Sequence, residues 1–124
     1  MRILVVDDHE AFGEALEHLI AATPNFVMVG RVSSGEEAVE AMERLSPQFI
    51  LMDVVMPGMG GIAAARTIMS RHPEVGILLI SLEDPAGYLD PEDRSDRLAC
   101  RRKQALSAHE LAVVWDGLNT CRDA

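Results

Sequence analysis

Three carboxylates stand where apolar runs of the sequence end. Asp7 and Asp8 follow the run at residues 3–6, and Asp53 follows the run at residues 49–52. Short continuous apolar runs with turn residues beyond them predict strands that are buried on both faces. In an open α/β sheet the carboxyl ends of parallel strands meet at one edge, and ligands bind at that edge. The sequence therefore predicts an acidic pocket there, with Asp53 as its central residue.

Such a pocket needs a cation, because three carboxylates within about 5 Å repel one another by roughly 3 kcal/mol per pair at an effective dielectric near 20. Mg²⁺ suits the pocket, since it binds one or two carboxylates together with phosphate oxygens. A carboxylate beside Mg²⁺ can attack phosphorus and form an acyl phosphate. Ser81, which ends the apolar run at residues 75–80, offers a hydroxyl to the phosphoryl oxygens, and Lys103, the only lysine, offers an ammonium.

The spacing of apolar and turn residues predicts the elements that would carry these groups. Strands and helices alternate as far as Ser81 and are joined by short connections, which is typical of an α/β fold with a parallel, doubly wound sheet. Ser33 and Glu36 predict a capping box at the start of the second helix. The expected strands span residues 3–6, 26–30, 48–53 and 75–80, and the expected helices span residues 10–22, 34–45 and 62–70.

Beyond the fourth strand the pattern is weaker. Residues 82–96 are acidic and rich in turn residues, so any helix there is expected to be short or irregular. Residues 98–102 are the expected fifth strand, although two arginines make it a poor one. Ser107 and Glu110 predict a second capping box, which opens a helix that runs to about Leu118.

Composition limits the class of protein. A chain of 124 residues, 48% of them hydrophobic, is large enough for one domain with its own core. The net charge of −9 disfavours direct binding to nucleic acid or to an anionic membrane. Cys100 and Cys121 have neither metal-ligand nor CxxC spacing, which indicates a reducing compartment. The first acids come too early for a signal peptide, and no apolar run has the length of a membrane span, so we expect a cytoplasmic domain.

Two segments resemble the receiver domain of bacterial two-component response regulators. The first strand and acid pair of that family are similar to ILVVDDHEAFGEAL, and its phosphoacceptor segment is similar to FILMDVVMPGMGG. Ser81 falls 28 residues after Asp53, and Lys103 falls 22 residues after Ser81, which are spacings that the family uses. The resemblance implies a flavodoxin-like α/β fold in which residues 1–124 form a single receiver domain. Its five-stranded parallel sheet would have the order 2-1-3-4-5.

The resemblance also implies roles for the residues of the pocket. Asp53 would accept a phosphoryl group from a sensor histidine kinase, and the chain would not be an enzyme. Asp8 and Asp53 would bind Mg²⁺ directly, Asp7 would bind it through water, and the carbonyl of Val55 would complete the set of protein ligands.

Ser81 and Lys103 would then contact the phosphoryl group, and this movement would change the surface of the last strand and helices. The partner that binds that surface would be a downstream protein or a carboxyl-terminal output domain that this sequence does not include. The resemblance also leaves the formation of a homodimer open.

The sequence departs from the family pattern around the last strand. Cys100 stands where the family has Tyr or Phe, and Arg101 stands at a site that is usually apolar. Asp96 and Arg97 replace a Gly-Ala pair, and Gln104 replaces a common proline. These departures affect the aromatic switch and dimer formation through the carboxyl-terminal face, and they predict that the helix before the fifth strand is either displaced or disordered.

Two alternatives stay open at this point. One is an interaction module with the receiver fold that does not depend on phosphorylation. It is favoured by residues 96–102 and by Leu82, which is bulkier than the usual Ala or Gly beside the phosphoryl pocket. The other is a small Mg²⁺-dependent phosphohydrolase with an aspartyl nucleophile, although the sequence shows neither a second acid placed as general acid nor a cap over the substrate. His9, which follows the acid pair, is expected to be a loop or helix-start residue rather than a ligand.

Overall fold

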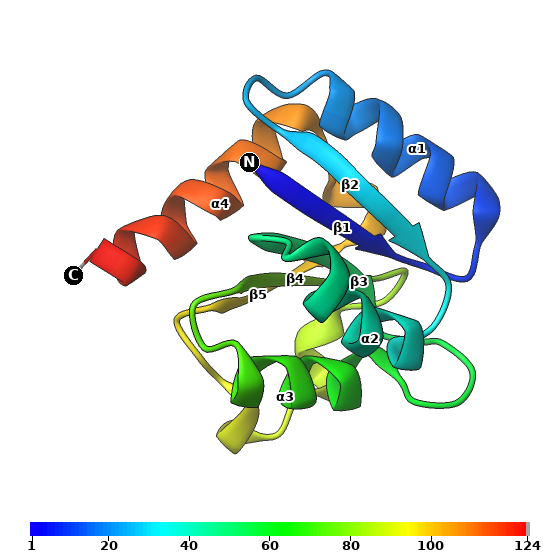
Figure 1. Ribbon diagram of the computed structural model, residues 1–124, viewed down its shortest axis with the longest axis vertical. Coiled ribbons are helices and arrows are strands. Elements are labelled where there is room, and N and C mark those ends of the chain that lie inside the picture. The colour runs from blue at the N-terminus through cyan, green and yellow to red at the C-terminus, as the bar shows by residue number, and fades with distance from the viewer. Residues whose placement is uncertain (124) are drawn as a thin grey trace.

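The protein contains one sheet of five parallel strands in the order β2-β1-β3-β4-β5 (Figure 1). A computed structural model describes residues 1–123, except for the side chains of residues 85, 86 and 119–123, among them Cys121. The predicted flavodoxin-like sheet and its strand order are confirmed. The strands are β1 (Arg2–Val6), β2 (Val27–Val32), β3 (Phe49–Asp53), β4 (Gly76–Ser81) and β5 (Leu98–Arg102).

Helices cover both faces of the sheet. The first and last, α1 (Glu10–Ala21) and α4 (Ala108–Asp123), pack on one face, whereas α2 (Gly35–Leu45) and α3 (Gly61–Arg71) pack on the other (Figure 1). Successive side chains of a strand point to opposite faces, so alternate residues of each central strand enter opposite cores. On β1, for example, Val5 packs with α1 and α4, while Val6 packs with α2 and α3.

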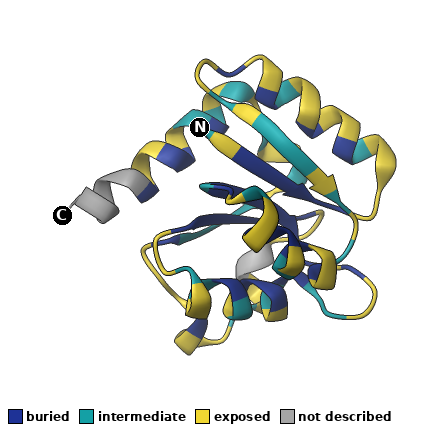
Figure 2. Ribbon diagram, in the orientation of Figure 1, coloured by how far each residue is buried: buried dark blue, intermediate teal, exposed yellow. Residues whose placement is uncertain are grey.

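The three central strands are buried along almost their whole length (Figure 2). Because both faces of a doubly wound sheet are covered, these strands are continuous apolar runs in the sequence and do not alternate apolar and polar residues. The edge strands β2 and β5 are only partly buried. Phe49 of β3 contacts Phe26 edge to face, with ring centroids 6.3 Å apart, and its ring lies 5.2 Å from that of Trp115 in α4. The buried central strands therefore fix the positions of the residues at their carboxyl ends.

The start of α2 differs from the prediction by one residue. The predicted capping box of Ser33 and Glu36 is wrong, because Ser34 is the cap and its hydroxyl accepts a hydrogen bond from the Glu37 backbone N–H at 3.1 Å. The Glu37 carboxylate in turn accepts from the Ser33 backbone N–H at 2.9 Å. Glu36 is thereby released to accept from the backbone N–H of Met59 at 2.6 Å, which ties α2 to the loop after β3.

The connection between β4 and β5 contains two short 3-10 helices, η1 (Pro85–Tyr88) and η2 (Pro91–Asp93), as the irregular pattern there predicts. A third, η3 (Lys103–Ala105), follows β5. The second predicted capping box forms only in part. Ser107 accepts a hydrogen bond from the Glu110 N–H at 3.0 Å, but the Glu110 carboxylate is occupied by Arg101 at 2.8 Å.

Cys100 of β5 is half-buried and packs against the core on the α2 and α3 side of the sheet. Burial raises the pKa of its thiol, and the negative charge of Asp84 adds to the effect. Among the described residues, none of the helices is both long enough and apolar enough to cross a membrane.

Candidate functional site

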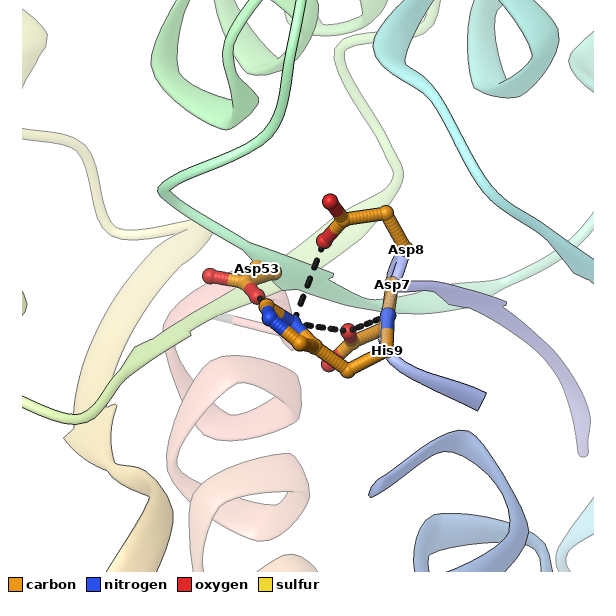
Figure 3. Close-up of side chains that lie close together, drawn as sticks. All are labelled: Asp7, Asp8, His9 and Asp53. Carbon is orange, nitrogen blue, oxygen red and sulfur yellow. Dashed lines mark hydrogen bonds and ion pairs between the residues drawn. The ribbon is translucent and has the colours of Figure 1, made fainter. Parts of the chain in front are cut away.

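Strand register brings the predicted acids together. Val6 of β1 pairs with Met52 of β3, so the next residues, Asp7 after β1 and Asp53 at the end of β3, lie at the same level of the sheet. Single carboxylate oxygens of Asp7, Asp8 and Asp53 lie within 4.8 Å of one another (Figure 3). Asp7 and Asp53 are buried, whereas Asp8 is exposed at the rim. The predicted acidic pocket at the carboxyl edge of the sheet is therefore present.

Local backbone contacts hold Asp53 in place. Its Oδ1 accepts a hydrogen bond from the N–H of Val55 at 3.0 Å. The first turn of α3 approaches so closely that a Cβ on Gly61 would lie 2.1 Å from the carbonyl oxygen of Asp53. Only glycine leaves room for that approach, and the Gly61 N–H donates to the carbonyl of Val54 at 3.0 Å. Gly61 is thus needed to seat α3 against the base of the pocket.

Lys103 supplies the cation. Its Nζ lies 3.0 Å from Oδ2 of Asp53 and 3.3 Å from Oδ2 of Asp7, and 4.3 Å from the ring centroid of Phe12. Its side chain is only 8% exposed. Burial alone would lower the pKa of Lys103. The hydrogen bond to Asp53 and the charges of Asp53 and Asp7 outweigh burial and raise the pKa above its ordinary value. Lys103 is therefore a charged partner of both acids at neutral pH.

Ser81, the last residue of β4, belongs to the same site. It is buried, and it lines a cavity of about 220 Å³ together with Asp53 and Lys103. Val55 and Leu82 line the same cavity, and both side chains are largely exposed. A buried carboxylate, an ammonium and a hydroxyl thus face one small space at the end of the sheet. This arrangement suits a compact anion with several oxygens.

Residues 3–90 match the model of the response regulator receiver domain. The chain belongs to this family. Its relatives include the transcriptional regulatory protein DegU of Brevibacillus brevis, which is 37% identical over 72% of this chain and 38% of that protein. Another is a protein-glutamate methylesterase/protein-glutamine glutaminase of Geobacter metallireducens, which is 41% identical over 75% of this chain and 25% of that protein. The chain therefore spans less than half the length of these relatives.

The similarity extends to solved structures. The signal receiver domain of the response regulator NarL from Mycobacterium tuberculosis superposes with a TM-score of 0.80 at 28% identity, and the match covers 95% of each chain. The resemblance inferred from the strand-end acids is therefore confirmed for the fold and for the family.

His9 is the residue of this receiver site that sequence reasoning missed. It occupies the N-cap position of α1, as expected of a helix-start residue, but its side chain caps nothing. Instead its ring turns into the pocket, where Nδ1 lies 3.3 Å from Asp7, 3.2 Å from Asp8 and 3.6 Å from Asp53 (Figure 3). The only signal in the sequence was its place directly after the acid pair.

The donor set of the pocket fits a divalent cation. Three carboxylates face one lysine, so negative charge is in excess. Oδ2 of Asp7 is buried and accepts no hydrogen bond from any residue that the structure describes, although the ammonium of Lys103 lies 3.3 Å away. A buried carboxylate oxygen of this kind is costly unless a cation compensates it. Receiver domains bind Mg²⁺ at an acidic pocket, and the acids of this chain are grouped suitably for it.

Proposed function

We propose that the chain is a phosphoacceptor receiver in which Asp53 takes a phosphoryl group from a phosphohistidine of a sensor histidine kinase. The observation that carries the proposal is the pairing of the buried Asp53 carboxylate with the Lys103 ammonium at 3.0 Å. A carboxylate fixed in one orientation beside a cation is placed to attack phosphorus, and the adjoining cavity offers space for the phosphoryl group.

In the proposed transfer, a carboxylate oxygen of Asp53 forms a bond to phosphorus. The bond from phosphorus to the kinase histidine breaks, and its electron pair stays on that nitrogen. Lys103 is already protonated and donates to one phosphoryl oxygen, while the hydroxyl of Ser81 donates to another. The chain's own groups thus orient the nucleophile and stabilise charge on the transferred group.

Asp8, Asp53 and the Val55 carbonyl are the proposed direct ligands of Mg²⁺, with Asp7 acting through water. When bound, Mg²⁺ neutralises negative charge on the phosphoryl oxygens. Asp7 also pairs with Lys103 at 3.3 Å, and this pairing holds the ammonium over the cavity. In this proposal Mg²⁺ balances the negative charge of the acids that Lys103 alone does not balance.

We propose that phosphorylation is read through protein contacts in the cytoplasm, where a histidine kinase phosphorylates itself. One relative is named as a transcriptional regulator and another as a methylesterase, and this chain spans only 38% and 25% of them. The reader is accordingly either a separate downstream protein or an output domain of a longer protein. The net charge of −9 disfavours direct contact of this domain with nucleic acid.

The proposal is tested by incubating the protein with Mg²⁺ and acetyl phosphate and measuring its intact mass. The wild-type chain should gain one phosphoryl group, and Asp53→Asn should gain none, because an amide is not a nucleophile here. Asp96→Asn, the same substitution at an exposed carboxylate, is the matched control and should gain the group normally.

Each failure has a distinct meaning. Equal mass gain in wild type and Asp53→Asn would place the acceptor elsewhere and overturn the proposal. No gain in the wild-type chain, from acetyl phosphate or from a phosphorylated kinase, would favour an interaction module that works without phosphorylation. Release of phosphate from a phosphomonoester over many turnovers would favour a phosphohydrolase.

A further inference from the structure

The ring of His9 lies in the acidic pocket with the geometry of a metal ligand. Its Nδ1 is separated by 3.2 Å, 3.3 Å and 3.6 Å from single oxygens of Asp8, Asp7 and Asp53. Two donor atoms that each lie about 2.1 Å from one ion are about 3.0 Å apart at an octahedral angle and about 3.4 Å apart at a tetrahedral angle. Two of the observed separations fall within this range, and the third, to Asp53, is 0.2 Å longer. The nitrogen and the three oxygens all lie within 4.8 Å of one another, so they can surround a single ion once the side chains draw closer together.

Nothing in the helix explains this orientation. As the N-cap of α1, His9 would be expected to point its side chain at the free N–H groups of the first turn, yet it makes no such hydrogen bond. Its backbone N–H donates to Asp7 Oδ1 at 2.7 Å, which folds the chain back so that the ring faces the acids. The ring lies beside the three acids (Figure 3), and its side chain remains 64% exposed, so solvent reaches it.

We propose that Nδ1 of His9 is an additional protein ligand in the metal site and shifts the selectivity of that site toward nitrogen-binding dications such as Co²⁺ and Zn²⁺. Carboxylate and carbonyl oxygens suit Mg²⁺ and Mn²⁺, whereas imidazole suits the later transition metals. Nδ1 binds through its lone pair, so Nε2 carries the ring proton and any proton on Nδ1 is released to solvent. The inference uses the pocket assigned under the proposed function, but it concerns the metal rather than the phosphoryl group.

The experiment compares metal affinities of the full chain as wild type, His9→Asn and His109→Asn. Binding of Co²⁺ is followed by its visible absorption, and binding of Mg²⁺ and Zn²⁺ by calorimetry. His9→Asn should weaken Co²⁺ and Zn²⁺ binding by about tenfold or more, with a much smaller effect on Mg²⁺. His109 is exposed on α4, so His109→Asn makes the same substitution away from the pocket and should change neither affinity.

A second readout reports the ligand directly. In nitrogen NMR of the histidine rings, Zn²⁺ should shift Nδ1 of His9 strongly and leave the other rings unchanged. Asparagine is a favourable N-cap residue, so His9→Asn is expected to fold, and its retained Mg²⁺ affinity would demonstrate an intact pocket.

Equal Co²⁺ affinity in wild type and His9→Asn, or an unshifted His9 ring, would overturn the inference. An equal loss for Co²⁺ and Mg²⁺ would also overturn it, because selectivity would then not reside in the imidazole. These outcomes are separable from failure of the proposed function. Asp53 could fail to gain a phosphoryl group while His9 still binds Co²⁺, and it could be phosphorylated with Mg²⁺ while His9 binds nothing.

Discussion

The chain up to Ser81 and the segment that follows it are held together by different forces. In the first region the strands are apolar and buried on both faces, and α3 is seated by close backbone contact at Gly61. In the second region β5 and α4 also join the sheet and the core, but charged side chains attach the connection before β5 and the start of α4. The guanidinium of Arg66 donates two hydrogen bonds to the carboxylate of Asp93, from Nε to Oδ1 at 2.5 Å and from Nη2 to Oδ2 at 2.7 Å. Arg101 pairs with Glu110 at 2.8 Å.

This difference indicates which part of a receiver can change its conformation most easily. Burial and steric exclusion hold Asp7 and Asp53 in fixed positions at the ends of their strands. The connection between β4 and β5 contains two 3-10 helices, and η2 is fastened to α3 by the ion pair of Asp93 with Arg66. Ion pairs respond to salt and pH, whereas apolar packing and steric exclusion respond much less. The connection between β4 and β5 should therefore yield before the central strands when conditions change.

The strongest test of the comparison is a pair of glycine substitutions, one in each region. Gly61→Ala places a Cβ 2.1 Å from the backbone oxygen of Asp53, so main chain must move. We expect a loss of about 3 kcal/mol in the free energy of unfolding, together with weaker metal binding. Gly87→Ala meets nothing within 4 Å and should change stability by no more than about 0.5 kcal/mol. Urea unfolding measures both, and equal losses would show that the second region is packed as tightly as the first.

A smaller loss in the free energy of unfolding is expected on substitution of Arg97, which is buried and attaches the segment before β5 to α4 and to the turn before β4. Its guanidinium donates to the carbonyl of Leu118 in α4 and, at 3.0 Å, to the carbonyl of Glu74 before β4. Arg97→Met keeps much of the volume but removes these donors, which should cost about 2 kcal/mol in urea unfolding. Arg94→Met, an exposed control in the same segment, should stay within about 0.5 kcal/mol. No loss in Arg97→Met would mean that α4 is held by apolar packing alone.

The attachment by Arg66 predicts a dependence on pH. The hydrogen bond from Arg66 lowers the pKa of Asp93 below its ordinary value of 3.8, despite the opposing effect of burial. Because the folded-state pKa is the lower one, the stabilisation is complete above 3.8 and is lost as the pH falls through the lowered value. Asp93→Asn should therefore reduce amide-exchange protection of the segment between β4 and β5 at neutral pH.

In acid the difference between Asp93→Asn and wild type should vanish, since the wild-type carboxyl is then also neutral. High salt should diminish it at neutral pH. A difference that persists in acid would show that the segment is held by something other than the charge of Asp93.

The fold could be predicted largely because buried strands appear in the sequence as continuous apolar runs. The central strands are apolar on both faces, and their limits were predicted within one residue. Edge strand β2 was expected at residues 26–30 but runs from Val27 to Val32, because an edge is half-exposed and its pattern is diluted by residues such as Gly30 and Arg31. Local rules also could not choose between adjacent serines, so the α2 cap was misplaced by one residue.

The site was predictable where position along a strand determines it. Asp7 and Asp53 follow from strand ends, and their closeness follows from parallel register. The orientation of His9 depends on a hydrogen bond of its own backbone, which no periodicity reveals. The ion pair of Arg66 with Asp93 joins residues 27 apart in the sequence, so composition could show that the segment is irregular but not how it is held.

The smallest expected effect on stability is at Leu82, where the two regions meet. This residue is 66% exposed beside the cavity that Asp53 lines, and its carbonyl accepts a hydrogen bond from Gln104 Nε2 at 3.2 Å, which alanine would retain. Leu82→Ala should change the free energy of unfolding by no more than about 0.5 kcal/mol, with Val113→Ala on α4 as an exposed control. If the proposed function holds, the wider mouth should speed phosphorylation by acetyl phosphate. A large loss of stability would instead make Leu82 part of the core and move the boundary between the regions beyond β4.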